Sequence, residues 1–571
     1  MRSSSASTAK SPCRRTSLAC ALVLGAWSVS HVRSQITPYP RSASARAAAQ
    51  KLPNPVADAV RGAARALAVT QPAEAPAALL ERARTAMRDG TPIERATAAV
   101  LLGSAGKLRD RSVLLAAFSE GNAEDPSGDP ARVGAHAIIG LGLLGGSASR
   151  LQLARLLSDK GSTRNERIMA ALALGLAATS WADRARGDSS SGEITARVLH
   201  LLRRNRDRYV NEIAACFVAL PADEGRGLLV EFLKSNEALP NRVVTVTRAI
   251  RSIRGLALAQ LGRRFGSDEE WVLLRAGLQS ARSPMRRYLT AWGLARHTGS
   301  LDDRRRERVV RLLVRRLQDN RPEVSAMALL ALARFDSPRA ARQARAVFKR
   351  ARQPDVRRGA AFLVLGEHGT ASDIALFERQ VDRDLGVSAR AGWCIGAARL
   401  ARRITPEAWP VGDGDAVAFP IPDLRLQLRV PTTPTDLVTV AAAVGLARLG
   451  DTKSALTIRD RLYATSRASD QRVLALAALR LDPRAMDERP ASIPGSLPLR
   501  QMQAWSYASA PQLWTPLLAL VSSADTSPED RARGFRLAAI AVAGTRAPSL
   551  WLREQVGPSP IPPAIQELAR F

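Results

Sequence analysis

The sequence ARVGAHAIIGLGLLG occupies residues 131–145, and related segments return at 323–335, 386–400 and 436–450. Each segment places alanine four residues after a valine, and leucine or isoleucine four residues after the alanine. Residues four apart lie on one side of an α-helix, so the spacing predicts a buried helical face whose central alanine admits a close neighbour. The residues concerned are Val133, Ala137 and Leu141; Val324, Ala328 and Leu332; Val387, Ala391 and Ile395; and Val438, Ala442 and Leu446.

Both ends of these predicted helices carry sequence signals. Gly145 and Gly450 stand twelve residues after the valine, where a glycine is typical of a helix end. A hydroxyl residue, a proline and then an acid mark helix starts at 91–94, 433–436 and 527–530. Ser283-Pro284 and Ser337-Pro338 carry the first two of these signals. Second amphipathic helices are expected at Ser149–Leu157, Arg304–Leu317, Arg339–Ala351 and Ser454–Tyr463.

Two helices in each unit of roughly 30–42 residues form a pattern that resembles HEAT and HEAT-like (PBS-lyase-type) helical repeat proteins. The resemblance extends over about residues 90–556. It implies an all-α fold, a right-handed α-α superhelix (a HEAT-like, armadillo-like solenoid) of about a dozen helical pairs. Proteins of this class mostly serve as scaffolds and binding surfaces, so the resemblance indicates architecture more than activity.

The composition also favours an all-α chain. Hydrophobic residues make up 46% of the 571 residues, but aromatic residues only 4%. The apolar content is therefore mostly alanine, leucine and valine, and small or straight side chains suit close-packed helices.

Shifts in composition divide the chain into seven parts. The breaks are set by the apolar N-terminal run, by the prolines of 402–433 and by the proline-rich end of the chain. We expect a signal peptide over 1–30, a disordered linker over 31–52, an N-terminal capping helical pair over 53–90, a repeat array over 91–401, a proline-rich insertion with a strand over 402–433, a continued repeat array over 434–556, and a proline-rich tail over 557–571.

The first 30 residues have the features of a secretory signal. Lys10, Arg14 and Arg15 precede an apolar run over 18–29, and small residues follow it. The run is short for a membrane span, and no other segment resembles one. The hypothesis is export to the periplasm or cell envelope, and the alternative is a start codon placed too early, before a disordered N-terminus.

The insertion at 402–433 breaks the repeat. Leu424, Leu426, Leu428 and Val430 alternate with polar residues, which predicts a half-buried strand. Two interpretations stay open: a binding arm on one face of the array, or a loop packed back on the solenoid.

Charge gives the clearest indication of a partner. The net charge is +32, with 84 basic residues against 52 acidic ones, and only seven of the basic residues are lysine. Codon bias in a GC-rich genome would favour arginine over lysine, but it would not produce the excess over acidic residues. The excess indicates affinity for polyanions.

Two predicted second helices concentrate this charge. Their basic residues recur at helical spacing, and the resemblance implies that second helices line the concave surface of the array. Such stripes would bind a polyanion; the alternative is two ordinary solvated helix faces. The candidate binding residues are Arg304, Arg308, Arg311, Arg315, Arg342, Arg345, Lys349 and Arg352.

Motifs for catalysis are absent from the sequence. It contains no phosphate-binding glycine loop of the Walker type, no G-x-S-x-G and no H-E-x-x-H. His136 and His368 stand apart from other candidate ligands, which gives no basis for a metal site. Cys216 and Cys394 are expected to be buried small hydrophobic residues. We therefore expect no enzyme activity, metal or cofactor.

The leading hypothesis is an exported scaffold that binds a protein or an anionic component of the cell envelope. The alternative is a HEAT-like protein that binds the phosphate backbone of nucleic acid. The predicted signal peptide argues against that alternative, and the low aromatic content argues against a groove that stacks bases.

Overall fold

The chain divides into two units, Met1–Leu52 and Pro53–Phe571, and all helices named below belong to the second. The expected signal peptide, nearly all of the linker, the C-terminal tail and Cys216 lie outside the described residues. The computed structural model describes residues 52–67, 74–121, 130–159, 161–178, 196, 200, 223–234, 254–281, 283–350, 352–381, 385–406, 419–429, 437–465, 467–486 and 497–544.

All regular elements over these residues are helices, so the predicted all-α solenoid is confirmed. First helices are α5 (Pro92–Ala105), α7 (Pro130–Leu144), α9 (Arg164–Ala178), α16 (Pro284–Ala295), α18 (Pro322–Phe335), α20 (Asp355–His368), α22 (Val387–Ile404), α24 (Leu437–Leu449), α26 (Ala468–Leu481), α27 (Leu497–Ala508) and α29 (Pro528–Ala543). Second helices are α4 (Ala77–Asp89), α6 (Asp110–Gly121), α8 (Ser147–Ser158), α13 (Asp223–Lys234), α15 (Asp268–Leu278), α17 (Asp303–Arg316), α19 (Ser337–Phe348), α21 (Ile374–Val381), α23 (Ile421–Arg429), α25 (Ala455–Ala464) and α28 (Trp514–Ser522). The remaining elements are α3 (Pro55–Arg65) and the 3₁₀ turns η1 (Ala371–Asp373), η3 (Thr452–Ser454) and η4 (Pro511–Leu513).

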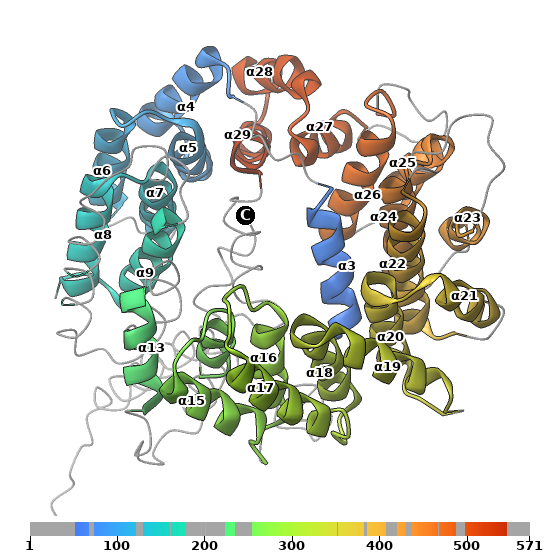
Figure 1. Cartoon of the computed structure of the whole chain (residues 1–571). Coiled ribbons are helices and arrows are strands. Elements are labelled where there is room, and N and C mark those ends of the chain that lie inside the picture. Colours follow the sequence, from blue (N-terminus) through green and yellow to red (C-terminus); the bar gives the residue numbers. More distant parts are fainter. Residues whose placement is uncertain are drawn as a thin grey trace, which may run out of the picture. The chain divides into compact units, whose positions relative to one another are not determined.

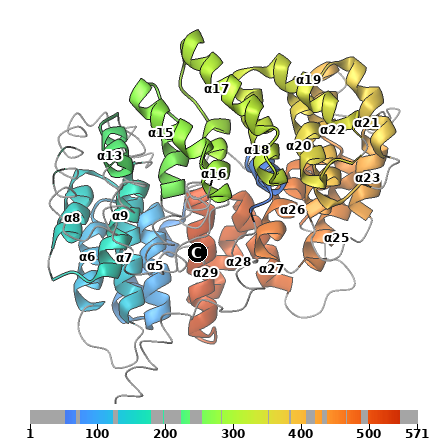
Figure 2. The same cartoon turned by 90° about the horizontal axis from the view of Figure 1, so that it is seen from below.

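First helices pack against each other in chain order. One run leads from α5 through α7 to α9, and a second leads from α16 through α18, α20, α22, α24, α26 and α27 to α29. The last helix, α29, then packs against the first, α5, although more than 400 residues separate them (Figures 1 and 2). Arg531 on α29 donates from Nε to Glu94 Oε1 on α5 at 2.5 Å. The two ends of the helical series are therefore joined to each other.

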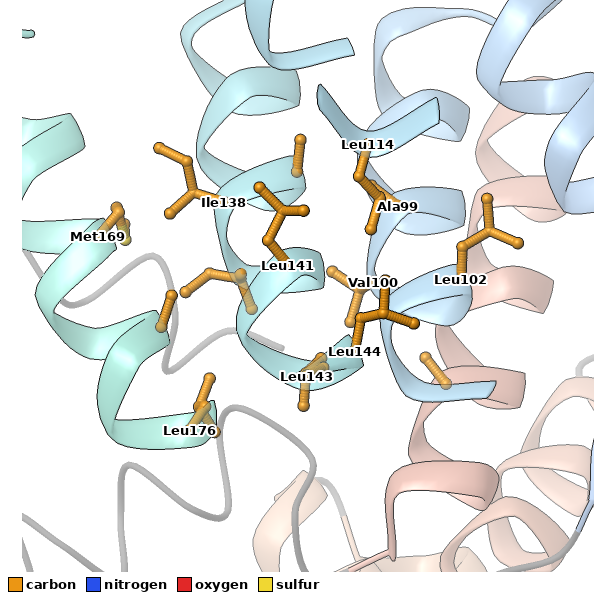
Figure 3. Close-up of a cluster of buried hydrophobic side chains, with 14 of the residues drawn as sticks. Ala99, Val100, Leu102, Leu114, Ile138, Leu141, Leu143, Leu144, Met169 and Leu176 are labelled. Carbon is orange, nitrogen blue, oxygen red and sulfur yellow. The ribbon is translucent and has the colours of Figure 1, made fainter. Parts of the chain in front are cut away.

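The core is built from the faces that first helices turn toward their neighbours. Figure 3 shows side chains of α5, α6, α7 and α9 between the helices, among them Leu102, Leu114, Leu141 and Leu176. The predicted alanine positions and leucine or isoleucine positions are all fully buried. Val387 is the exception among the valines, since 40% of its surface is exposed. Aliphatic burial over a long series of such contacts holds the array together.

Glycines allow first helices to approach at backbone distance. A methyl group added at Gly103 on α5 would lie 2.4 Å from the Cα atom of Gly140 on α7. The same relation holds between Gly366 on α20 and Gly396 on α22, at 2.5 Å. No side chain fits at these crossings, because the atoms in the way are backbone and cannot rotate aside.

Most of the predicted helix ends are confirmed. Gly145 and Gly450 have φ of 69° and 73°, a left-handed conformation that glycine adopts without strain. Thr91 forms a capping box with Glu94, and the hydroxyls of Ser283 and Ser527 each cap a helix start. The start at 433–436 lies outside the described residues. At Ser337-Pro338 the prediction was wrong by one residue, since the cap of α19 is Asp336, which accepts from the Arg339 amide at 2.9 Å.

The expected capping pair over 53–90 is wrong, because α3 and α4 pack against different parts of the array. α4 packs on α5, α6 and α28, whereas α3 lies across the first helices α18, α20, α22, α24 and α26 (Figure 1). The buried carboxylate of Asp58 on α3 accepts from Trp292 Nε1 at 2.8 Å and from Arg296 at 3.3 Å. Its partners stand more than 230 residues away, so no local pattern could indicate this docking.

The predicted strand over the leucines at 424–428 is also wrong. Residues Ile421–Arg429 form helix α23, the second helix that packs against α24. Ile421, Leu424 and Leu428 are buried, whereas Leu426 is 55% exposed. Leucines at alternate positions fit the period of a strand and also that of a helix. The helical spacing of Ile421, Leu424 and Leu428 prevails because it presents one apolar face to α24. Part of the expected insertion therefore belongs to the repeat array.

The glycine crossing between α5 and α7 predicts an unusual response to alanine. Gly103→Ala should lower the free energy of unfolding by roughly 1–3 kcal/mol, because the methyl group meets the backbone of Gly140. Gly62→Ala on α3 is the matched control: a methyl group there has no neighbour within 4 Å. It should raise the free energy of unfolding by about 0.5–1 kcal/mol through helix propensity. Thermal and urea unfolding of both variants checks this, and equal shifts would contradict it.

Candidate polyanion-binding surface

Helix α17 carries the first basic stripe. Asp302 begins it by accepting from the Arg305 amide at 2.7 Å, and Val309, Val310, Leu312 and Leu313 are buried on its inner side. Arg304, Arg311 and Arg315 are exposed on the outside, as the helical spacing predicts. Arg308 is partly withdrawn from that stripe, since it donates to Asp268 of α15 at 3.0 Å.

Helix α19 and the residues after it carry the second stripe. Arg342, Lys349 and Arg352 are exposed. Arg345 lies differently: its guanidinium donates from Nε and Nη2 to both carboxylate oxygens of Asp373, each at 2.7 Å. A bidentate pair of this kind holds Arg345 in place and neutralises it, so Arg345 belongs to the framework of the array.

The two stripes are neighbours on the array. Glu307 of α17 lies 3.8 Å from Arg339 of α19 and 3.7 Å from Arg311 on its own helix. Among described residues, no carboxylate forms an ion pair with the other exposed cations of the stripes. These are Arg304, Arg315, Arg342, Lys349 and Arg352. With respect to the described carboxylates, the surface thus offers five unpaired cations and one weakly paired one.

The second helices, which the resemblance places on the concave surface, lie on one side of the layer of first helices. α3 packs on the first helices, and α18 and α20 lie between α3 and α19 (Figure 1). The second helices therefore form the side of the layer away from α3. The physical reason lies in the distribution of apolar residues. The first helices carry apolar residues on most of their circumference and are covered on both sides. Helices α17 and α19 are amphipathic, so one side is buried and the other faces solvent.

A second use of arginine escaped the sequence analysis. Arginines on second helices bind an aspartate at the start of the next second helix, 26 or 28 residues later. Each pair is bidentate, and each aspartate is almost fully buried. The pairs are Arg84 with Asp110, Arg345 with Asp373, and Arg425 with Asp451. A signal was present in the sequence, since each aspartate stands one to four residues after a glycine at the end of a helix.

Two of these Arg–Asp clamps change the acidity of their carboxyl groups. Burial by itself would raise the pKa of Asp373, but hydrogen bonds from Arg345 and from the Thr370 amide lower that pKa below its ordinary value. The pKa of Asp110 is lowered in the same way by Arg84 and the Lys107 amide. The clamps therefore stabilise the folded chain only while these carboxyl groups are ionised.

The remaining candidate groups are placed as packing residues. Cys394 is fully buried, which raises the pKa of its thiol and confirms the prediction of a small buried residue. His136 is buried on α7, and His368 is half-buried at the end of α20. Within the described ranges, no three His, Cys, Asp or Glu side chains gather where they could hold a metal ion. The same part of the chain contains no helix long and apolar enough to cross a membrane.

Comparison with known proteins adds no identity. No protein-family model matches this sequence, and no curated protein matches it. The fold and the placement of the charged side chains therefore carry the functional proposal.

The Arg–Asp clamps predict a loss of stability in acid. A carboxyl group whose pKa is lowered in the folded state stabilises the fold at pH values above the pKa that the group has in the unfolded chain. This contribution is lost as the pH falls through the folded-state pKa. The midpoint temperature of thermal unfolding should therefore decrease once the pH falls below about 4. Arg345→Gln should lower the free energy of unfolding at pH 7 by about 1–3 kcal/mol and flatten the acid dependence.

Arg342→Gln is the control for this experiment, because Arg342 lies on the same helix and is exposed. It should leave both the stability at pH 7 and its acid dependence unchanged. Thermal unfolding between pH 3 and pH 7 measures both quantities. Indistinguishable profiles for the two variants would show that the Arg345–Asp373 clamp does not contribute.

Proposed function

We propose that this chain is a non-catalytic scaffold of the HEAT-like class that binds an extended polyanion through its second helices α17 and α19. The observation that carries the proposal is the set of exposed cations on these two neighbouring helices. Arg304, Arg315 and Arg342 are exposed, and no described carboxylate pairs with them. Counterions released from a polyanion on binding would favour association without a deep pocket.

The fold supports a binding role for this surface. First helices are covered by their neighbours, and the closing contact between α29 and α5 joins the ends of the series. Second helices contribute only their apolar side to the core and leave the other side to solvent. An array of this kind holds a large, shallow surface in a fixed shape, which suits protein or polymer partners better than small substrates.

We place the protein outside the cytoplasm, on the basis of the basic and apolar N-terminal residues. The partner is then an acidic protein or an anionic polymer of the cell envelope. The same cations would contact nucleic acid phosphates if the chain remained in the cytoplasm.

Removing four stripe cations should weaken polyanion binding. The variant is Arg311→Gln, Arg315→Gln, Arg342→Gln and Lys349→Gln, measured by titration with heparin and with a random-sequence DNA duplex at several salt concentrations. Its affinity at low salt should fall at least tenfold. The slope of the logarithm of the binding constant against the logarithm of the salt concentration should decrease in magnitude by about 2–4. The control loses four exposed arginines elsewhere: Arg82→Gln, Arg88→Gln, Arg155→Gln and Arg480→Gln.

The control keeps the same net charge as the stripe variant, so it measures the effect of total charge alone. It should change the affinity by less than threefold. If both variants lose the same affinity, binding follows net charge and the stripes are not a site.

Location is tested independently of binding. Fractionation of the native cells and N-terminal sequencing of the chain should find it in the envelope or periplasm, starting between about residues 29 and 50. A cytoplasmic chain that retains residue 1 would contradict export. The stripe proposal would then apply to nucleic acid instead of an envelope polymer.

A further inference from the structure

A separate group of arginines lines a cavity at the ends of three successive first helices. The cavity has a volume of about 380 Å³ and lies between the C-terminal ends of α20, α22 and α24. Arg399, Arg402 and Arg403 enter it from α22, and Arg448 from α24. Among the described residues, Glu367 at the end of α20 is the one acidic residue in its wall. None of these residues belongs to the α17 and α19 stripes.

The charges in this cavity are poorly balanced. Arg399 lies 3.4 Å from Glu367, whose side chain is 61% exposed. The other three guanidinium groups donate to neutral backbone carbonyls: Arg402 to Arg448 at 3.0 Å, Arg403 to Gly369, and Arg448 to Ala63 at 3.3 Å. Carbonyls at helix ends carry only partial negative charge. In the part of the chain that the structure describes, four cations therefore face one carboxylate.

Arg448 shows the imbalance most directly. Burial lowers its pKa to about 10, and repulsion from Arg399 and Arg402 acts in the same direction. Its Nε atom is buried and has no hydrogen-bond partner. A buried donor without an acceptor costs about 1–3 kcal/mol unless something satisfies it. Over the described residues, the wall of the cavity thus carries more positive than negative charge, and it holds one buried donor without an acceptor.

We propose that this cavity is a binding site for a phosphate group. A tetrahedral oxyanion supplies two negative charges and several acceptor oxygens, and arginine side chains bind such groups bidentately. The volume lies at the lower end of the range for small-molecule pockets and exceeds the space that one phosphate needs. The group is therefore inorganic phosphate or the phosphate of a small ester. This site is independent of the polyanion surface, so either proposal can fail without the other.

Binding at this site would also stabilise the array. The lining residues come from three helices, and Arg448 also donates to the last turn of α3. An anion among them would reduce the repulsion within the group and hold α20, α22 and α24 together with α3. A ligand that binds only the folded state raises its stability in proportion to RT ln(1 + [L]/Kd).

The test uses the full chain with inorganic phosphate, glycerol phosphate, and glutarate as a dicarboxylate, each against sodium chloride at equal ionic strength. Calorimetric titration and thermal unfolding should show saturable binding of one phosphate group per chain and a rise in the unfolding midpoint. The variant Arg399→Gln/Arg402→Gln should weaken phosphate binding at least tenfold. The control Arg311→Gln/Arg342→Gln removes two cations from the stripes and should leave phosphate binding unchanged.

Several results would overturn the proposal: no saturable phosphate binding in the millimolar range, equal loss in both double variants, or tighter binding of glutarate than of phosphate. Circular dichroism in the absence of phosphate verifies that each variant is folded, and the single variant Arg403→Gln serves if the double variant is not. Tighter binding of glycerol phosphate than of inorganic phosphate would assign the site to phosphate esters; the reverse order would assign it to free phosphate.

Discussion

The close crossing of successive first helices is the constraint on which the other features of this structure depend. At Gly103 and Gly140, and again at Gly366 and Gly396, two helix backbones meet where no side chain fits. This distance fixes how far each repeat is displaced from the last, and small errors would accumulate along an array. It also fixes where the second helices stand, and hence the spacing of every charged group on them. The contact of α29 with α5 then adds a constraint that an open array lacks.

Arginine serves two different purposes in this chain, and the presence of a buried carboxylate partner separates them. Arg345 and Arg342 lie three residues apart on α19, yet the first is clamped to a buried carboxylate and the second is exposed. The clamped arginines connect one second helix to the next and account for part of the basic composition. A high count of arginines is thus a poor guide to a binding surface until the paired ones have been set aside.

The candidate surface could be predicted in part. Helical spacing placed Arg304, Arg311 and Arg315 together on one exposed face, because the i, i+7 and i+11 geometry is a local property of any helix. It could not show that Arg308 and Arg345 find carboxylates on neighbouring helices, or which side of the array the helices form. The arginines of the cavity were passed over for the same reason, since Arg448 joins Arg399 and Arg402 only after α22 and α24 have packed.

Local sequence patterns predicted the helices, most of their caps and the buried alanine and leucine positions, because helical periodicity and capping act within a few residues. They failed at 421–429, where alternate leucines satisfy two periods, and at 53–90, where neighbouring helices have distant partners. The docking of α3 across α18 to α26, the contact of α29 with α5 and the convergence of four arginines on one cavity are visible only in the folded chain. These contacts join residues far apart in the chain, and their free energy comes from burial and charge pairing that no local pattern encodes.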